Sequence, residues 1–139
     1  MRFNEISSPE EIAKYLIYKF KELGFRVLYY KSRSSKSCYL KLDGGVAYSL
    51  RISDHWSYKN HLVYKFSLNT QYTGHKIKLV NYKRQYIYGP DHVKKLIGDI
   101  NIERKIQRMK LGDYKYEKFI HNAISKCAQH KSLKVFKEV

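Results

Sequence analysis

Cysteine and long apolar runs are both scarce in this chain, and each scarcity excludes a class of protein. The two cysteines, Cys38 and Cys127, lie far apart without CxxC or CxxH spacing, which argues against a disulfide framework or a local zinc site. No apolar run approaches the roughly 20 residues of a membrane span, and the opening "MRFNEISSPE" lacks the apolar core of a secretion signal. We therefore expect a soluble, cytoplasmic protein with buried or idle thiols and no membrane partner.

Sequence signatures of catalysis and cofactor binding are missing as well. The chain has no GxSxG nucleophile elbow and no GxxxxGK phosphate loop. Its six histidines are His55, His61, His75, His92, His121 and His130. Because none of them shows HxH, HxxE or HExxH spacing, a metal site would have to be assembled from residues distant in sequence. We expect no enzyme activity, no metal and no cofactor.

Acidic residues are the third scarcity. Twelve Asp and Glu against 28 Lys and Arg give a formal charge of +16 over 139 residues. Such an excess repels itself and destabilises the compact state unless a polyanion compensates it. Nucleic acid is the first candidate, ahead of an anionic membrane, because the 14 tyrosines are spread over strand-like runs and no long amphipathic helix concentrates the charge. The same excess argues against tight self-association, so we expect a monomer.

The N-terminal segment predicts a helix over residues 9–23. Ser8 suits the N-cap, Pro9 suits the first helical position, Glu11 completes a capping box, and Gly24 is a C-terminal stop. The apolar stripe that we expect to face the core consists of Ile12, Leu16, Phe20 and Leu23.

Beyond Gly24 the periodicity changes to that of strands, rich in aromatic and β-branched residues. The strands that we expect are 25–30, 37–42, 46–52, 61–68 and 76–88, the last with a break near Asn81. Asp43, Gly44 and Gly45 tolerate the positive φ of a tight turn, so the second and third strands should form a hairpin.

The last third of the chain is expected to be helical, over 91–130. One stripe consists of Val93, Leu96, Ile97 and Ile100, and a second of Tyr116, Phe119, Ile120, Ala123 and Ile124. Gly98 and Asn101 are candidate breaks, and the basic tail 131–139 is either a last strand or an arm. The prediction is one α+β domain over 1–139: an N-terminal helix, an antiparallel sheet of four to five strands within 25–88, and two to three C-terminal helices.

The stretch "RISDHW" contains an Asp-His pair, Asp54 and His55, before the single tryptophan. Adjacent strand residues point to opposite faces, so the pair would need a turn to form a catalytic hydrogen bond. A strand end, with Ser53 or Asp54 bonding free backbone N–H groups, is the favoured interpretation. The alternative is that His55 and Trp56 contact a partner, by stacking on a base or docking in a pocket.

Basic clusters carry the functional prediction. The segment "YYKSRSSKS" places Lys31, Arg33 and Lys36 among serines, where cations, hydroxyls and backbone N–H groups can meet phosphates. The segment "HKIKLVNYKRQYIY" interleaves cations with tyrosines, a pattern typical of RNA and single-strand surfaces. The alternatives are a solvated loop and an exposed strand that lysines keep from aggregating. The predicted binding residues are Lys31, Arg33, Lys36, Arg51, His55, Trp56, Lys76, Lys78, Tyr82, Lys83, Arg84 and Tyr86.

The hairpin "YLKLDGGVAYSLRISDH" ends in Arg51-Ile52-Ser53-Asp54-His55, which resembles the Arg-[Ile/Leu]-Ser-[Asp/Asn]-His ending of small phage and mobile-element proteins. These include broad-spectrum inhibitors of type II CRISPR nucleases, which bind the nuclease with its guide RNA and suppress cleavage of target DNA. The C-terminal "DYKYEKFIHNAISKCAQHKSLKVFKEV" is loosely similar to the same group. This resemblance implies an anti-CRISPR protein.

The order helix, hairpin strands, helix is also similar to the double-stranded-RNA-binding fold and to the small toxin ribonucleases built on it. Those ribonucleases carry Gly-Ser-His near the position of "SSKSCYL" here, and the histidine is missing. We therefore expect a phage-type anti-CRISPR protein that blocks DNA binding or cleavage by a type II CRISPR nuclease carrying guide RNA. A stand-alone RNA- or DNA-binding regulator is the alternative, followed by a toxin ribonuclease.

Overall fold

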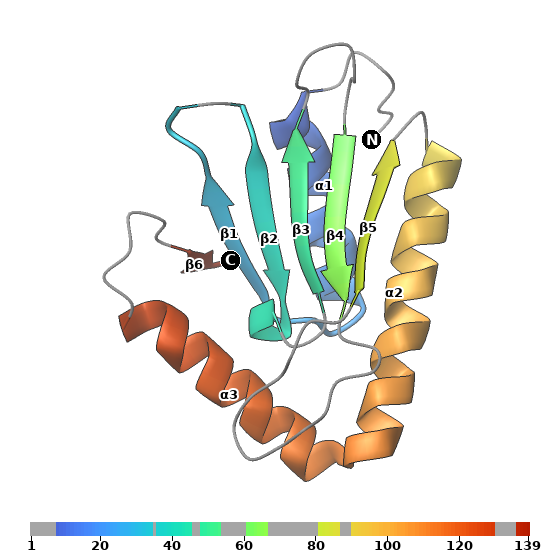
Figure 1. The fold of residues 1–139 in the computed structure, drawn as a ribbon, viewed down its shortest axis with the longest axis vertical. Helices are drawn as coiled ribbons and strands as arrows, with labels where there is room; N and C mark the ends of the chain where they lie inside the picture. The colour runs from blue at the N-terminus through green and yellow to red at the C-terminus, as the bar shows by residue number, and fades with distance from the viewer. Residues whose placement is uncertain are drawn as a thin grey trace.

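The structure, a computed structural model, describes residues 8–34, 36–45, 48–53, 61–66, 81–86, 90–129 and 136–139. In chain order the elements are α1 (Pro9–Glu22), β1 (Val27–Lys31), β2 (Cys38–Leu42), the 3-10 turn η1 (Asp43–Gly45), β3 (Tyr48–Ser53), β4 (His61–Phe66), β5 (Asn81–Tyr86), α2 (Pro90–Leu111), α3 (Asp113–Gln129) and β6 (Lys137–Glu138). Figure 1 shows α1 behind the sheet, α2 toward its β5 edge, and α3 near η1 at the lower end. The predicted α+β class is confirmed.

The predicted N-terminal helix is α1, and its start is fixed as the capping box requires. The Ser8 hydroxyl accepts a hydrogen bond from the Glu11 backbone N–H at 3.2 Å, and Pro9 occupies the first turn. Beyond Glu22 the chain turns at Gly24, whose φ is 86°. Of the predicted stripe, the fully buried members are Ile12, Leu16 and Phe20.

The sheet has the order β5-β4-β3-β2-β1-β6, and all neighbouring strands are antiparallel. It therefore has one strand more than the four to five expected. The added strand is β6, whose Lys137 and Glu138 pair with Tyr29 and Leu28 at the β1 edge. The Glu138 carboxylate also accepts two hydrogen bonds from the Arg26 guanidinium, at 2.7 and 2.8 Å, which ties this part of the tail to the sheet.

The turn between β2 and β3 confirms the predicted hairpin. Asp43, Gly44 and Gly45 have φ values of 53°, 70° and 93°, all in the left-handed region that glycine adopts freely and aspartate tolerates. β5 begins at Asn81, where a break was predicted, and residues 76–80 of that predicted strand lie outside the described residues.

The C-terminal helices of the described residues number two, within the two to three predicted, and neither candidate break is used. α2 runs without interruption through Gly98 and Asn101, because an interior glycine costs only about 1 kcal/mol and buried residues of α2 pack in the core on both sides of Gly98. Residues of that stripe share the core with α1 and the inner face of the sheet; they are Val93, Leu96 and Ile100. Tyr116 and Ile120 of α3 are the buried residues of a smaller, separate cluster.

Candidate nucleic-acid interface

The sheet has an inner face packed against α1 and α2 and an outer face that no helix of the described residues covers (Figure 1). Alternation along β1, β2 and β3 decides which residues lie on each face. Val27, Leu40 and Leu50 belong to the inner face and its core. The outer face carries Leu28, Tyr30, Tyr39, Lys41, Ser49 and Arg51.

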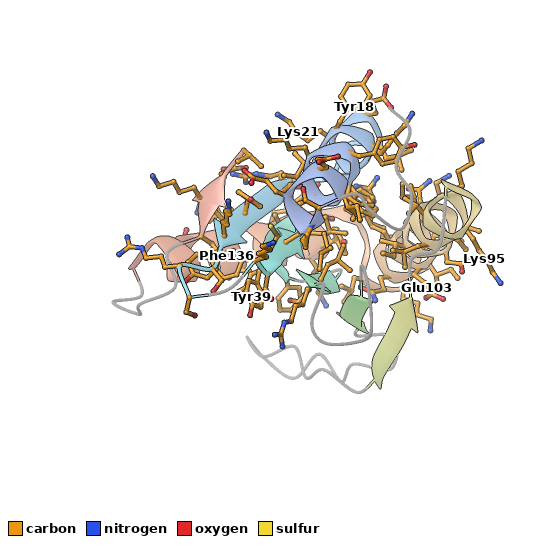
Figure 2. The ribbon with its side chains drawn as sticks, turned by 90° about the horizontal axis from the view of Figure 1, so that it is seen from above. Tyr18, Lys21, Tyr39, Lys95, Glu103 and Phe136 are labelled. Carbon is orange, nitrogen blue, oxygen red and sulfur yellow. The ribbon has the colours of Figure 1, made fainter. Side chains whose placement is uncertain are left out.

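Three aromatic rings neighbour one another on this outer face, and a cation lies beside the ring at each end of the group. Tyr30 is directly opposite Tyr39 in the β1–β2 pairing, with ring centroids 5.7 Å apart, and Phe136 adds a third ring at 5.6 Å from Tyr30. The Lys41 Nζ lies 4.5 Å from the Phe136 ring centroid, and the Arg51 guanidinium lies 5.8 Å from that of Tyr39. All five residues, which we call the outer-face cluster, are partly exposed. Figure 2 shows Tyr39 and Phe136 on the side of the sheet away from α1.

The arrangement of this cluster suits a polyanion with exposed bases. Aromatic faces offer stacking surfaces for bases of any sequence, and neighbouring ammonium and guanidinium groups offer charge to the phosphates between them. The spacing of neighbouring rings, between 5 and 6 Å, is that of ordinary aromatic pairs, so the rings hold one another in place without a ligand.

The β1–β2 loop adds two of the predicted cations. Arg33 and Lys36 are exposed, and neither forms an ion pair within the described part of the chain. The Ser32 backbone N–H donates to the Ser37 carbonyl at 3.0 Å, which closes the loop beneath them. The loop therefore presents both cations at one end of the sheet.

Lys31 is separated from this group by its partner. Its Nζ donates to the Glu10 carboxylate on α1 at 2.8 Å, so Lys31 lies on the α1 side of the sheet. The hydrogen bond with Glu10 raises the pKa of Lys31 and, in return, lowers the pKa of Glu10. The structure thus places Lys31 in an exposed ion pair rather than with the outer-face cluster.

The four predicted residues of β5 occupy four different cross-strand rows of the sheet. Arg84 pairs with Val63, which pairs with Arg51, so Arg84 lies in the row of the outer-face cluster. Tyr82 lies in the row of Ser49, and Tyr86 lies in the row of Ser53. Both rows are two residues along β3 from that of Arg51. Lys83 instead pairs with Tyr64, which pairs with the core residue Leu50.

Four predicted binding residues, and one of the catalytic candidates, lie outside the described residues: His55, Trp56, Lys76, Lys78 and Asp54. β3 is described as far as Ser53, and the rest of the Asp-His stretch, on which the strand-end interpretation depends, lies outside the described residues. Three aromatic residues and one lysine of the outer-face cluster were not predicted: Tyr30, Tyr39, Phe136 and Lys41. The alternation within "VLYYK" and "CYLKL" indicates that Tyr30, Tyr39 and Lys41 share one face of the sheet, so these three could have been predicted. Phe136 could not, because the tail brings it to this face from a distant part of the sequence.

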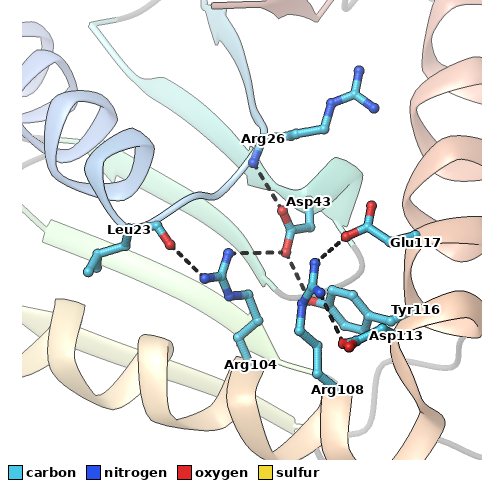
Figure 3. A network of polar contacts seen from close by, with 8 residues as sticks. All are labelled: Leu23, Arg26, Asp43, Arg104, Arg108, Asp113, Tyr116 and Glu117. Atoms are coloured by element: carbon cyan, nitrogen blue, oxygen red, sulfur yellow. Dashed lines mark hydrogen bonds and ion pairs between the residues drawn. The ribbon is translucent and has the colours of Figure 1, made fainter.

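A second concentration of polar groups lies at the opposite end of the sheet, around Asp43 (Figure 3). The carboxylate of Asp43, which is 1% exposed, accepts a hydrogen bond from the Arg26 backbone N–H at 3.0 Å and another from the Tyr116 hydroxyl at 2.9 Å. The Arg104 guanidinium lies 3.9 Å from the same carboxylate and donates to the Leu23 carbonyl at 2.6 Å. This network joins the end of α1, the hairpin turn, α2 and α3.

Burial dominates the electrostatics of this network. It raises the pKa of Asp43, against the opposing effect of the two hydrogen bonds and the nearby arginines. Burial, together with the adjacent carboxylate, also raises the pKa of Tyr116. The Arg108 guanidinium lies 4.7 Å from the Tyr116 ring centroid and is itself held by Asp113 and Glu117. Because Tyr116 is fully buried and both Asp43 oxygens are occupied, we interpret the network as structural.

The described residues hold no group of three or more His, Cys, Asp or Glu side chains arranged for a metal ion. Of the helices within that part of the chain, none combines the length and the apolar character needed to cross a bilayer. Cys38 is a buried free thiol, as expected, and burial raises its pKa.

Comparisons with protein-family models, curated proteins and solved structures found no match to this chain.

Proposed function

We propose that this protein binds single-stranded nucleic acid through the outer face of its sheet and acts by occupying that ligand rather than by chemistry. The observation that carries the proposal is the outer-face cluster, in which three aromatic rings and two cations share one surface. Cations alone would serve any polyanion, but rings beside them favour a polyanion with unpaired bases.

The charge of the whole chain supports a polyanionic ligand. Ion pairs among the described residues engage Lys19, Arg26, Lys31, Arg104 and Arg108, and none of these pairs includes Arg33 or Lys36. The formal charge of +16 over the whole chain therefore favours a polyanionic ligand. Arg33 and Lys36 extend the positive surface beyond the cluster, toward the β1–β2 end.

In its finer form the proposal concerns a CRISPR nuclease. The likeness of the hairpin ending to phage anti-CRISPR proteins supports guide RNA, or the path of target DNA, as the ligand in a type II effector. The protein would then compete for a strand that the effector holds in its own positive channel. A stand-alone RNA- or DNA-binding regulator is the same binding function without the effector.

The test is a comparison of two double variants with equal changes in charge. Lys41→Glu/Arg51→Glu reverses the two cations of the outer-face cluster, and Lys14→Glu/Lys21→Glu reverses two exposed lysines of α1. Binding of labelled oligo(U) and of a duplex of equal length is measured by fluorescence anisotropy over a salt series. Circular dichroism melting confirms that each variant folds.

The affinities of the two variants and the preference of wild type test the proposed binding surface. The outer-face variant should lose about 10-fold or more in affinity for oligo(U), and lower the magnitude of its salt slope by about 1.4 if both cations contact phosphates. The α1 variant should lose distinctly less, and wild type should prefer oligo(U) to the duplex. Equal losses in the two variants would mean that net charge alone binds, and preference for the duplex would reject the stacking role.

The finer proposal has its own measurement. Cleavage of target DNA by a type II nuclease carrying guide RNA is followed with wild type and with both double variants. Inhibition by wild type and by the α1 variant, but not by the outer-face variant, supports an anti-CRISPR role through this face. Oligo(U) binding without any inhibition of cleavage supports the stand-alone regulator.

A further inference from the structure

Helix α2 carries a second apolar stripe, on the side away from its core contacts. Ile102, Ile106 and Met109 are 57%, 38% and 84% exposed. At about 100° of rotation per residue, these three positions fall within an arc of about 60° around the helix. Figure 2 shows Lys95, which has the same angular position two turns earlier on α2, pointing away from the body of the molecule. Single exposed apolar residues are ordinary, but a continuous stripe marks an interaction surface.

We propose that this stripe pairs with the same stripe of a second copy of the chain, as two antiparallel α2 helices related by a two-fold axis. The positions on α2 are complementary to themselves in that arrangement. When Ile102 of one copy lies opposite Ile106 of the other, the symmetry repeats the same contact with the roles exchanged. The two copies would thus bury four isoleucines at the centre of the contact.

Gly98 gives the outer residue of the stripe a place to pack. In the same alignment, Met109 of one copy lies within about one residue of the level of Gly98 in the other, on the same flank of the helix. A Cβ added at Gly98 would meet nothing within 4 Å in its own chain, so the surface there is shallow and open. A long, adaptable methionine side chain fits over such a position.

Charges beside the stripe add a pairing that only a second copy can make. In an antiparallel helix pair with this symmetry, each flank faces the same flank of the other helix. Asp99 and Lys110 lie on one flank, and the alignment brings Asp99 of one copy to the level of Lys110 of the other, twice by symmetry. Within one chain these two residues are about 16 Å apart along the axis. Neither forms an ion pair among the described residues.

Repulsion between like charges keeps this association weak and gives it a distinctive response to salt. On the other flank Lys105 meets Lys105 of the second copy, and two chains of formal charge +16 repel each other at long range. Added salt screens that repulsion, so self-association should strengthen as ionic strength rises. Binding to nucleic acid changes in the opposite direction, so the two associations are separable.

Sedimentation equilibrium of the full chain tests the proposal, over a concentration series reaching about 1 mM. Wild type should shift from monomer toward dimer with concentration, and further at higher salt. Ile106→Glu should remain monomeric, whereas Tyr18→Glu, on an exposed residue of α1 that is 60% accessible, should behave as wild type. A wild type that stays monomeric throughout overturns the proposal, as does a dimer that Ile106→Glu leaves intact.

A charge exchange tests the alignment itself. Asp99→Lys and Lys110→Asp should each weaken the dimer by several-fold, and the double variant should recover most of the loss, because the two groups meet only between copies. Lys105→Gln should tighten the dimer by removing the like-charge contact. Recovery in the double variant supports the antiparallel arrangement, and additive losses would refute it.

Discussion

Substituting Tyr116 by phenylalanine removes one hydroxyl from the network around Asp43 and nothing else. That hydroxyl donates to the buried carboxylate at 2.9 Å, and a hydrogen bond to a charged group contributes about 1.5–3 kcal/mol to the free energy of unfolding. Because the Arg104 guanidinium remains 3.9 Å from the same carboxylate, the loss is partly compensated, and we expect about 2 kcal/mol. With a urea dependence of about 2 kcal/mol/M, the unfolding midpoint should fall by about 1 M.

The assay is urea unfolding of wild type, Tyr116→Phe and Tyr114→Phe, followed by circular dichroism. Tyr114 is the matched control, since it lies on the same helix and is 80% exposed, so its hydroxyl should contribute less than about 0.5 kcal/mol. If the two variants unfold at the same urea concentration, the network does not hold α3 in place. A double-mutant cycle with Asp43→Asn should give a coupling of about 1 kcal/mol or more.

Three further predictions concern the hairpin turn and the core. Gly44→Ala should destabilise the protein by about 2–4 kcal/mol, because the new Cβ would lie 2.9 Å from the Cβ of Ala123 at a φ of +70°. Gly98→Ala, on the exposed side of α2, should instead stabilise the protein by up to about 1 kcal/mol. Thermal melting that ranks the two variants the other way refutes the close packing of the turn. Burial raises the pKa of Asp43, so the native state binds the proton of this carboxyl more tightly than the unfolded state does. The contribution of the carboxyl to stability therefore falls as pH rises above the unfolded pKa of 3.8. Wild type should gain stability relative to Asp43→Asn as pH is lowered from neutral, and a relative gain by the variant contradicts the raised pKa. In a Cys127→Ser background, Cys38 should react with a thiol reagent far more slowly in native protein than in urea, and equal rates would contradict its burial.

The parts of the fold that local chemistry controls were predictable from the sequence. The cap formed by Ser8 and Glu11 set the start of α1, and the left-handed residues at Asp43 and Gly44 set the hairpin. Neither candidate break interrupts α2, because Gly98 acts only through local propensity, which the packing of the buried stripe outweighs.

The parts that depend on distant contacts were not predictable. Lys31 belongs by sequence to a basic loop, yet Glu10 from α1 neutralises it, because β1 lies beside that helix. Phe136 reaches the outer-face cluster only because the tail returns to pair with β1. Tyr116 was predicted as part of an apolar stripe, and the sequence around it does not indicate that its hydroxyl donates to the distant carboxylate of Asp43.

The contact between Asp43 and Tyr116 joins residues 73 positions apart, which bears on the order in which the chain can fold. During synthesis the hairpin is complete long before α3 leaves the ribosome, so the carboxylate of its turn must stay hydrated until Tyr116 arrives. Closing so long a loop is slow relative to forming a hairpin or a helix. We expect α3 to dock last, and the nascent sheet to remain open at its lower end until that step is complete.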